Sequence, residues 1–351
     1  MNTAFVKINK LHYYIHVIMF DRKNATHYIL AFSLIVLASY VGNAFKQKFS
    51  DSTSDEYELI KKYLLNESPL YGYNKPKIWI HSKYEVNARN WNSRNSTNLN
   101  QPYLHLTIQS IIDHCGDDFH VCLIDDNTFS SLIPGWDTDV QHLPDPLKTN
   151  ARKIGLTTLL YLYGGMIVPN SFVCSKSLKP LLDGGKPFVC EAINRTESHR
   201  QMTFISDMFF MGAGRNSEII FKLIESMKHS NQFTIEREFM GTENKWLNQA
   251  ISDHKIDLVG GDKIGIKTKS GKPILLEDLM EDKFLDLSPD CYGIYIPTDE
   301  VLRRTKYQWF ANISRQQLLD ESDAAIVKYI KASMVDEYSK SSSAIPSAVS
   351  L

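Results

Sequence analysis

Polar residues that could do chemistry come directly after apolar segments of the sequence. Asp125 and Asp126 follow Phe119–Ile124, and Pro169–Ser171 follows Met166–Val168. Ligands of open α/β sheets bind at the carboxyl ends of the strands, so these residues are predicted to border one site. For the two aspartates, two interpretations stay open: an acceptor for a bound base or ribose, or a turn that bonds its own backbone. For Asp126, an unusual metal site is a third.

Two further acids lie in apolar surroundings later in the chain. Glu191 follows the predicted strand Pro187–Cys190, and Asp207 lies inside the apolar run Phe204–Phe210. An acid in such a run is either a paired structural residue or a functional group with a raised pKa. Asp207 and Glu191 are therefore the predicted catalytic residues, with a structural role as the alternative for each.

The elements that must position these residues alternate between strands and helices. Strands rich in apolar residues that alternate with helices predict an α/β fold with a mainly parallel sheet covered on both sides. Leu104, Ile108, Ile111 and Ile112 recur at helical spacing, and Gly116 ends that helix. The other predicted elements are the strands Lys77–Ile80, Phe119–Ile124 and Met166–Val168, and the helices Ala151–Tyr163 and Ser217–Lys228.

Composition and cysteine content exclude some classes of protein. The 351 residues carry a net charge of −1, so binding dominated by a nucleic-acid backbone is not expected. The five cysteines are scattered, without C-x-x-C pairs or metal-finger spacing, and we expect buried free thiols. An odd number leaves at least one thiol unpaired in an oxidising lumen.

The N-terminal region is predicted to anchor the chain in a membrane. Residues 24–45 contain no Lys, Arg, Asp or Glu, and about 20 apolar residues span a bilayer as a helix. Basic residues precede this run, which favours a cytoplasmic N-terminus and a type II single-pass topology. A buried core helix and a cleaved signal peptide are the alternatives. The catalytic-like part would then be lumenal or otherwise non-cytoplasmic.

These observations predict five consecutive regions. They are a cytoplasmic tail (1–25), a transmembrane signal anchor (26–45), a stem (46–74), a globular domain (75–335) and a disordered tail (336–351). Five N-x-S/T triplets, at Asn24, Asn66, Asn95, Asn194 and Asn312, give mild support to a lumenal glycoprotein.

Three segments resemble one group of enzymes. They are Lys77–His81, Phe119–Asp126 and the Leu-Tyr-Leu-Tyr-Gly-Gly sequence that ends at Gly165. Together they resemble the glycosyltransferase family with a DxD sugar-binding region, which is family 32-like and related to capsular polysaccharide synthesis proteins. The resemblance covers about residues 75–227. It implies a GT-A type nucleotide-diphospho-sugar transferase fold, a nucleotide-sugar donor, a glycan acceptor and a divalent metal such as Mn²⁺ or Mg²⁺.

The sequence departs from this family at the metal motif. The family's Ser-Asp pair and the Arg three residues later align with Arg152, Lys153 and Leu156. Its Asp-x-Asp falls on Pro169–Ser171, so Asn170 and Ser171 occupy the positions next to the donor. Hard cations favour charged oxygen ligands, so no metal ligand is assigned and the need for a metal is left open.

Cationic side chains are the predicted replacement for the metal. Positioned Lys or Arg can stabilise the charge that builds up on a departing nucleoside diphosphate. Lys153 and Arg152 would serve this purpose, with Lys148 one turn earlier; the alternative is the solvated face of a helix. The resemblance also places Gly164 and Gly165 in the donor site.

Two functions from different classes follow. The first is a hexosyl-type glycosyltransferase that moves a sugar from a nucleotide-sugar donor to a glycan, glycoprotein or glycolipid, without the usual metal. The second is a catalytically inactive relative that binds a glycan or a partner protein. A hydrolase is a distant third, because no pair of carboxylates can be assigned from the sequence.

Overall fold

A computed structural model describes residues 75–85, 96–97, 100–194, 203–229 and 236–342 of the chain. The predicted tail, anchor and stem (1–74) lie outside the described residues. Within the described ranges, no helix is both long enough and apolar enough to cross a membrane.

One mixed sheet forms the centre of the described domain. Six strands from the described ranges lie in the order β4-β1-β5-β8-β7-β9. Strand β8 runs antiparallel to β5 and β7, and the other neighbours pair in parallel. The predicted α/β fold with a mainly parallel sheet is therefore confirmed. The strands are β1 (Lys77–His81), β4 (His120–Ile124), β5 (Gly165–Ile167), β7 (Phe188–Ile193), β8 (Phe204–Ala213) and β9 (Asp257–Val259).

Two short antiparallel pairs accompany this sheet. Strand β6 (Phe172–Cys174) pairs with β10 (Gly293–Tyr295), which ties the segment after β5 to the C-terminal part of the domain. Strand β2 (Tyr84–Glu85) pairs with β3 (Ser96–Thr97). The β6–β10 pair matters for the site, because β6 begins directly after the predicted donor-binding residues.

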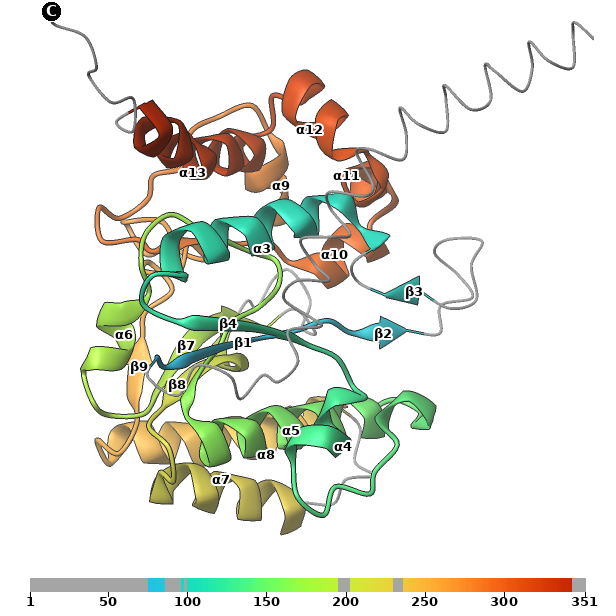
Figure 1. The fold of residues 1–351 in the computed structure, drawn as a ribbon, viewed down its shortest axis with the longest axis vertical. Helices are drawn as coiled ribbons and strands as arrows, with labels where there is room; N and C mark the ends of the chain where they lie inside the picture. The colour runs from blue at the N-terminus through green and yellow to red at the C-terminus, as the bar shows by residue number, and fades with distance from the viewer. Residues whose placement is uncertain (1–74, 86–95, 98–99, 195–202, 230–235, 343–351) are drawn as a thin grey trace, which may run out of the picture. The chain divides into compact units, whose positions relative to one another are not determined.

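Helices cover both faces of the sheet (Figure 1). On one side lie α4 (Thr128–Leu132), α5 (Leu147–Tyr163), α7 (Glu218–His229) and α8 (Glu236–Ser252). On the other lies α3 (Pro102–Cys115), with C-terminal helices above it. These are α9 (Leu276–Met280), α11 (Gln308–Asn312), α12 (Arg315–Glu321) and α13 (Ala325–Ser342), and the remaining helical segments are α6 (Lys179–Asp183), α10 (Thr298–Arg303), η2 (Val140–His142) and η3 (Thr305–Tyr307).

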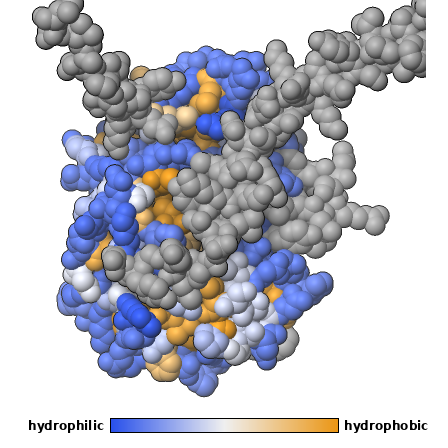
Figure 2. Space-filling view, viewed as in Figure 1, coloured by the Kyte–Doolittle hydropathy of each residue, from blue (hydrophilic) through white to orange (hydrophobic). Residues whose placement is uncertain are grey.

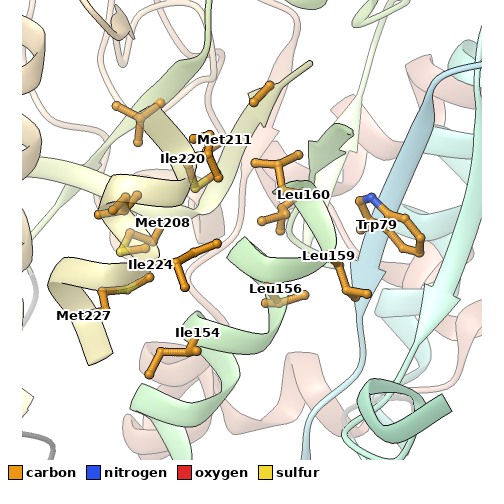
Figure 3. Packing of buried hydrophobic residues seen from close by; sticks show 14 of the residues in the cluster. Trp79, Ile154, Leu156, Leu159, Leu160, Met208, Met211, Ile220, Ile224 and Met227 are labelled. Atoms are coloured by element: carbon orange, nitrogen blue, oxygen red, sulfur yellow. The ribbon is translucent and has the colours of Figure 1, made fainter. Parts of the chain in front are cut away.

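Helix α5 is held between the sheet and helix α7. Figure 3 shows Leu159 of α5 beside Trp79 of β1, and Leu160 beside Met211 of β8 and Ile220 of α7. All five of these side chains are at most 1% exposed. Each such side chain contributes about 1.5–3 kcal/mol by leaving water, so the position of α5 on the sheet is fixed by packing.

A second hydrophobic core lies on the other side of the sheet. It joins α3 to the C-terminal helices, with the ring of Tyr103 tilted against that of Phe310 at a centroid distance of 4.7 Å. Outward-facing residues are mainly polar, and the coloured surface in Figure 2 is largely hydrophilic with smaller hydrophobic patches. The helices therefore turn their apolar sides inward, as amphipathic periodicity predicts.

Three predicted boundaries differ from the structure. Helix α5 begins at Leu147, four residues before the predicted start, and so includes Lys148. Strand β7 continues to Ile193, so Glu191 lies within the strand instead of after it. Helix α13 continues to Ser342, so the tail predicted as disordered from residue 336 begins inside a helix; residues 343–351 lie outside the described ranges.

Candidate active site at the carboxyl edge of the sheet

The carboxyl ends of β1, β4 and β5 meet at one edge of the sheet. These strands pair in parallel, with Ile80 opposite Leu123 and Trp79 opposite Ile167. Helix α5 connects β4 to β5, so it starts at this edge and ends at the opposite one. The first two turns of α5 therefore bring their side chains to the edge where ligands bind in such sheets.

The end of β4 carries a buried ionic cluster. Asp126 receives two hydrogen bonds from the Arg152 guanidinium, from Nε to Oδ1 at 2.9 Å and from a terminal nitrogen to Oδ2 at 2.8 Å. His81, at the end of β1, lies with Nε2 at 2.9 Å from Oδ1 of the same carboxylate. The side chains of Arg152 and Asp126 are 2% and 0% exposed. This cluster joins β1, β4 and α5.

Burial and charge set the protonation of this cluster. Burial acts most strongly on Asp126 and disfavours its charge, yet the hydrogen bonds and charges of His81 and Arg152 together lower its pKa to about 2. Burial lowers the pKa of His81, against the hydrogen bond and charge of Asp126. His81 is then a neutral imidazole that donates from Nε2 to an ionised Asp126. The ring stacks on Phe129 at a centroid distance of 5.6 Å.

Lys153, the next residue of α5, forms a second buried pair. Its Nζ lies 2.6 Å from Oε2 of Glu243 in α8, and the two side chains are 6% and 4% exposed. Neither Arg152 nor Lys153 therefore lies on a solvated helix face, which excludes that alternative. Both cations are also balanced by a carboxylate, which sequence could not show.

Asp207 has different surroundings. Met211 of β8 pairs with Ile167 of β5, so the residues before Met211 extend toward the carboxyl edge. Asp207 is half-buried, and its Oδ1 accepts a hydrogen bond of 2.8 Å from the backbone nitrogen of Phe209. Burial raises its pKa, against that hydrogen bond and the charges of Lys153 and Lys83. Burial therefore gives Asp207 the raised pKa of the second interpretation, and its catalytic role stays a prediction.

Glu191 is engaged in structural contacts. Its Oε2 accepts a hydrogen bond of 2.8 Å from the backbone nitrogen of Gly261 and lies 2.6 Å from Nζ of Lys267. The Lys267 ammonium also lies 3.7 Å from the ring centroid of Phe204. One oxygen of this carboxylate makes both contacts, which fit the structural alternative for Glu191 better than the role of a base.

Asn170 and Ser171, two of the residues aligned with the Asp-x-Asp of the resembled family, make contacts that hold the fold together. Asn170 donates from Nδ2 to the His81 carbonyl at 3.2 Å, and Ser171 donates from Oγ to the Ile296 carbonyl at 2.8 Å. The two residues are 7% and 1% exposed. Their side chains hold the segment between β5 and β6 against β1 and the strand β10 region.

The two glycines after α5 have a backbone role. Gly164 and Gly165 have φ values of 69° and 98°, a region that side chains disfavour. A Cβ atom on Gly165 would lie 2.1 Å from the Lys77 carbonyl oxygen. Both residues lie at the C-terminal end of α5, opposite the edge described above, and the Gly164 carbonyl accepts a hydrogen bond from Trp79 Nε1 at 3.0 Å. The structure thus places them away from the other predicted donor-binding residues.

The residues at the edge do not fit a divalent metal site. Asp126 directs both carboxylate oxygens at Arg152, and Asn170 and Ser171 donate to backbone carbonyls. Asp125 is used in a turn, where its Oδ1 accepts from the backbone nitrogen and the hydroxyl of Thr128 at 3.0 and 2.7 Å. Among the described residues, no three His, Cys, Asp or Glu side chains are grouped as metal ligands.

Lys148 and Lys83 add two cations beside these pairs. Lys148 lies four residues before Arg152, so both occupy the same face of α5. It is 6% exposed and forms no ion pair with any residue in the described ranges. Lys83 follows β1, and its Nζ lies 5.5 Å from the ring centroid of Phe209. Lys83 and Lys148 thus accompany Arg152 and Lys153, which pair with Asp126 and Glu243.

The structure brings Asp126, Arg152, Lys153, Asn170 and Asp207 to one edge; the order of strands and helices predicted this for Asp126 and Asn170. Sequence reasoning missed Glu243, Lys83 and Lys267. For Glu243 a signal existed: it lies four and seven residues before Leu247 and Ala250, on the buried face of α8. An acid on an apolar helix face indicates a buried partner.

Comparisons with known proteins assign no family. A scan against protein-family models finds no match, and a search of curated proteins finds no similar sequence. The conclusions about function therefore rest on the geometry of this edge and on the residues that carry the resemblance.

Proposed function

We propose that the described domain is a glycosyltransferase of GT-A type that binds its nucleotide-sugar donor at the carboxyl edge of the sheet without a metal. The observation that carries this proposal is Lys148, a buried cation on the first two turns of α5 that forms no ion pair with a described residue. Lys148, Arg152 and Lys153 are all buried there, next to the ends of β1 and β4. Buried cations at a ligand-binding edge suit an anionic ligand.

The start of α5 adds to this positive potential. The positive end of a helix dipole favours phosphate at the first turn, although in α5 the backbone nitrogens of Lys148 and Asn150 already donate to the carbonyls of Pro144 and Pro146. No acidic residue lies in the first turn of α5. The diphosphate of a donor would therefore bind near Lys148, with the Arg152–Asp126 and Lys153–Glu243 pairs behind it.

This arrangement supplies electrostatic stabilisation for sugar transfer. When the glycosidic bond to the diphosphate breaks, negative charge grows on the leaving oxygen, and fixed cations stabilise that charge. Lys148 is the cation best suited to this, because it is not already paired with a described carboxylate. Arg152 and Lys153 are positioning residues, since their charges are satisfied by Asp126 and Glu243.

Asp207 is the proposed general base of an inverting transfer. It lies at the same edge, and its raised pKa makes the carboxylate a stronger base than an ordinary aspartate. It would take the proton of the acceptor hydroxyl as that oxygen attacks the anomeric carbon. The nucleoside diphosphate then leaves with the bond electrons.

An inactive relative that binds a glycan or a partner is the second candidate. It is favoured by one observation: Asp126, Glu191 and Glu243, three of the acids near the edge, are each engaged by a cation. Such pairs stabilise a fold without needing a substrate.

Release of nucleoside diphosphate separates the two candidates. The full chain would be incubated with a panel of uridine and guanosine diphosphate sugars and a mixture of glycan acceptors, with EDTA or with Mn²⁺. The proposal predicts acceptor-dependent release that persists in EDTA and is lost in Asp207→Asn. Donor binding without turnover in either buffer would instead support the inactive relative, and turnover only with Mn²⁺ would contradict the metal-free site.

A further inference from the structure

The sulfur atoms of two of the five cysteines contact each other. Sγ of Cys115 and Sγ of Cys174 are 3.8 Å apart, although the residues are 59 positions apart in the chain. Both residues are 0% exposed. We propose that Cys115 and Cys174 form a disulfide when the chain meets an oxidising thiol–disulfide environment, and that this bond fixes the segment 169–174 to α3.

The backbone on both sides is already held in place for such a bond. The Thr107 hydroxyl donates to the Asn170 carbonyl, and the Ser110 hydroxyl accepts from the Cys174 backbone nitrogen at 2.9 Å. Thr107, Ser110 and Cys115 thus bring one side of α3 onto the segment that precedes and includes β6. A disulfide needs its two sulfur atoms about 2.05 Å apart, so they must approach from 3.8 Å while these neighbouring contacts hold α3 and β6 together.

The pKa values of the two thiols shift in opposite directions, which indicates which sulfur attacks first. The hydrogen bond with Cys174 lowers the pKa of Cys115, against burial. The same contact, together with burial, raises the pKa of Cys174. Cys115 is therefore the sulfur that more readily becomes a thiolate, and the thiolate is the attacking form.

The reaction is ordinary thiol–disulfide exchange with a small-molecule disulfide such as oxidised glutathione. The Cys115 thiolate attacks one sulfur of that disulfide, forms a mixed disulfide and expels one glutathione thiolate. Cys174 then loses its proton and attacks the Cys115 sulfur, which expels the second glutathione. The two cysteines lose two electrons and two protons, and one glutathione disulfide becomes two thiols.

Burial determines when the exchange can take place. Neither sulfur is exposed in the folded domain, so the reaction requires folding or a transient local opening. The other three cysteines are also buried. Sγ of Cys122 and of Cys291 contact backbone carbonyls, of His120 at 3.7 Å and of Gly293 at 3.0 Å, respectively. Sγ of Cys174 also contacts a backbone carbonyl, that of Lys176 at 3.2 Å, so the sulfur contact with Cys115 is what distinguishes it from these internal controls.

The proposed disulfide would further fix the segment 169–174, which borders the candidate site. The segment 169–174 contains Asn170 and Ser171, which hold it to β1 and to Ile296. A disulfide at its far end adds a covalent tie to α3. A cross-link restricts the unfolded chain, so the oxidised protein is expected to unfold at a higher temperature than the reduced protein. This inference does not depend on the proposed transferase activity.

Redox titration of the purified full chain tests the proposal. The native protein would be equilibrated in glutathione buffers from reducing to oxidising, quenched with acid, and alkylated in denaturant before digestion and mass spectrometry. Cys115 and Cys174 should lose alkylation together, and one cross-linked peptide pair should appear that is lighter by two hydrogen atoms. Cys122, Cys190 and Cys291 should stay alkylated.

Two variants sharpen the result. Cys174→Ser should leave Cys115 alkylated or carrying a single glutathione and should abolish the difference in unfolding temperature. Cys291→Ser is the matched control and should retain both the cross-link and the difference. The proposal is overturned if Cys115 and Cys174 of the unmutated chain stay alkylated in the most oxidising buffer, or if either one forms its cross-link with another cysteine.

Discussion

Two aspartates at the same edge of the sheet have opposite surroundings. Asp126 is enclosed by Arg152 and His81, and its pKa falls to about 2. Asp207 has one backbone hydrogen bond and its pKa is raised by burial. The difference shows how neighbours, and not residue type, separate an acid that holds strands and helices together from one that can exchange a proton.

The largest effect is expected for Asp207→Asn in the transfer reaction. Asparagine keeps the size and can keep the hydrogen bond from Phe209, but it cannot accept a proton. Removing a general base typically lowers turnover by about 10²- to 10⁴-fold. Initial rates of nucleoside diphosphate release measure this, with Glu191→Gln as the matched control, which should keep most of its activity. Equal losses in both variants would contradict the separate roles.

The same substitution should not weaken the fold. A raised pKa means that ionised Asp207 destabilises the folded state, and this effect grows as the pH rises above the ordinary value of 3.8. Asp207→Asn should therefore unfold at the same temperature as the unmodified chain, or higher, at neutral pH. A clear drop in unfolding temperature would indicate a structural role for Asp207.

Arg152→Leu is expected to have the next largest effect, on stability. It leaves the buried Asp126 carboxylate without its cation, and breaking such a pair from one side typically costs about 3–5 kcal/mol. Urea unfolding would measure the loss. The double variant Arg152→Leu with Asp126→Leu removes both charges and should recover much of it. If the double variant is no more stable than Arg152→Leu alone, the unpaired Asp126 carboxylate is not the cause of the loss.

The pH dependence of stability should report on Asp126 next. A folded-state pKa near 2 against an ordinary 3.8 corresponds to about 2.5 kcal/mol of stability. Because the folded pKa is depressed, this contribution is present above pH 3.8 and is lost as the pH falls toward 2. The stability advantage of the unmodified chain over the double variant should shrink across this window.

The smallest effect is expected at the pair of Glu191 and Lys267. Their side chains are 13% and 20% exposed, so solvent screens part of the interaction. Glu191→Gln should cost about 1 kcal/mol of folding stability, since the amide can still accept from the Gly261 backbone nitrogen. A loss of several kcal/mol would place this pair with the fully buried cluster of Asp126.

Local sequence patterns predicted the elements that form the edge. Apolar runs located β1, β4 and β5, and the two glycines located the end of α5, because a positive φ after a helix is a backbone requirement that the residue type reveals. The order of strands and helices then predicted which chain segments would meet. These features depend on neighbours in sequence and are readable from it.

The ion pairs at the edge could not be predicted from local sequence patterns. Lys153 and Glu243 are 90 residues apart, and Arg152 and Asp126 are 26 apart. Which acid meets which cation depends on how α5 and α8 pack on the sheet, and no local spacing encodes that. The same reason explains why Glu191 was predicted to be catalytic: its partner Lys267 lies in a distant loop.

Calorimetric titration of nucleoside diphosphates into the full chain, with EDTA throughout, tests the central claim of a metal-free donor site most directly. Lys148→Met provides the comparison, because Lys148 forms no ion pair with a described residue and its removal leaves no buried carboxylate behind. The account predicts binding in EDTA that weakens about tenfold or more in Lys148→Met, at unchanged unfolding temperature. Absence of binding in EDTA together with binding in Mn²⁺, or equal affinity in both proteins, would contradict it.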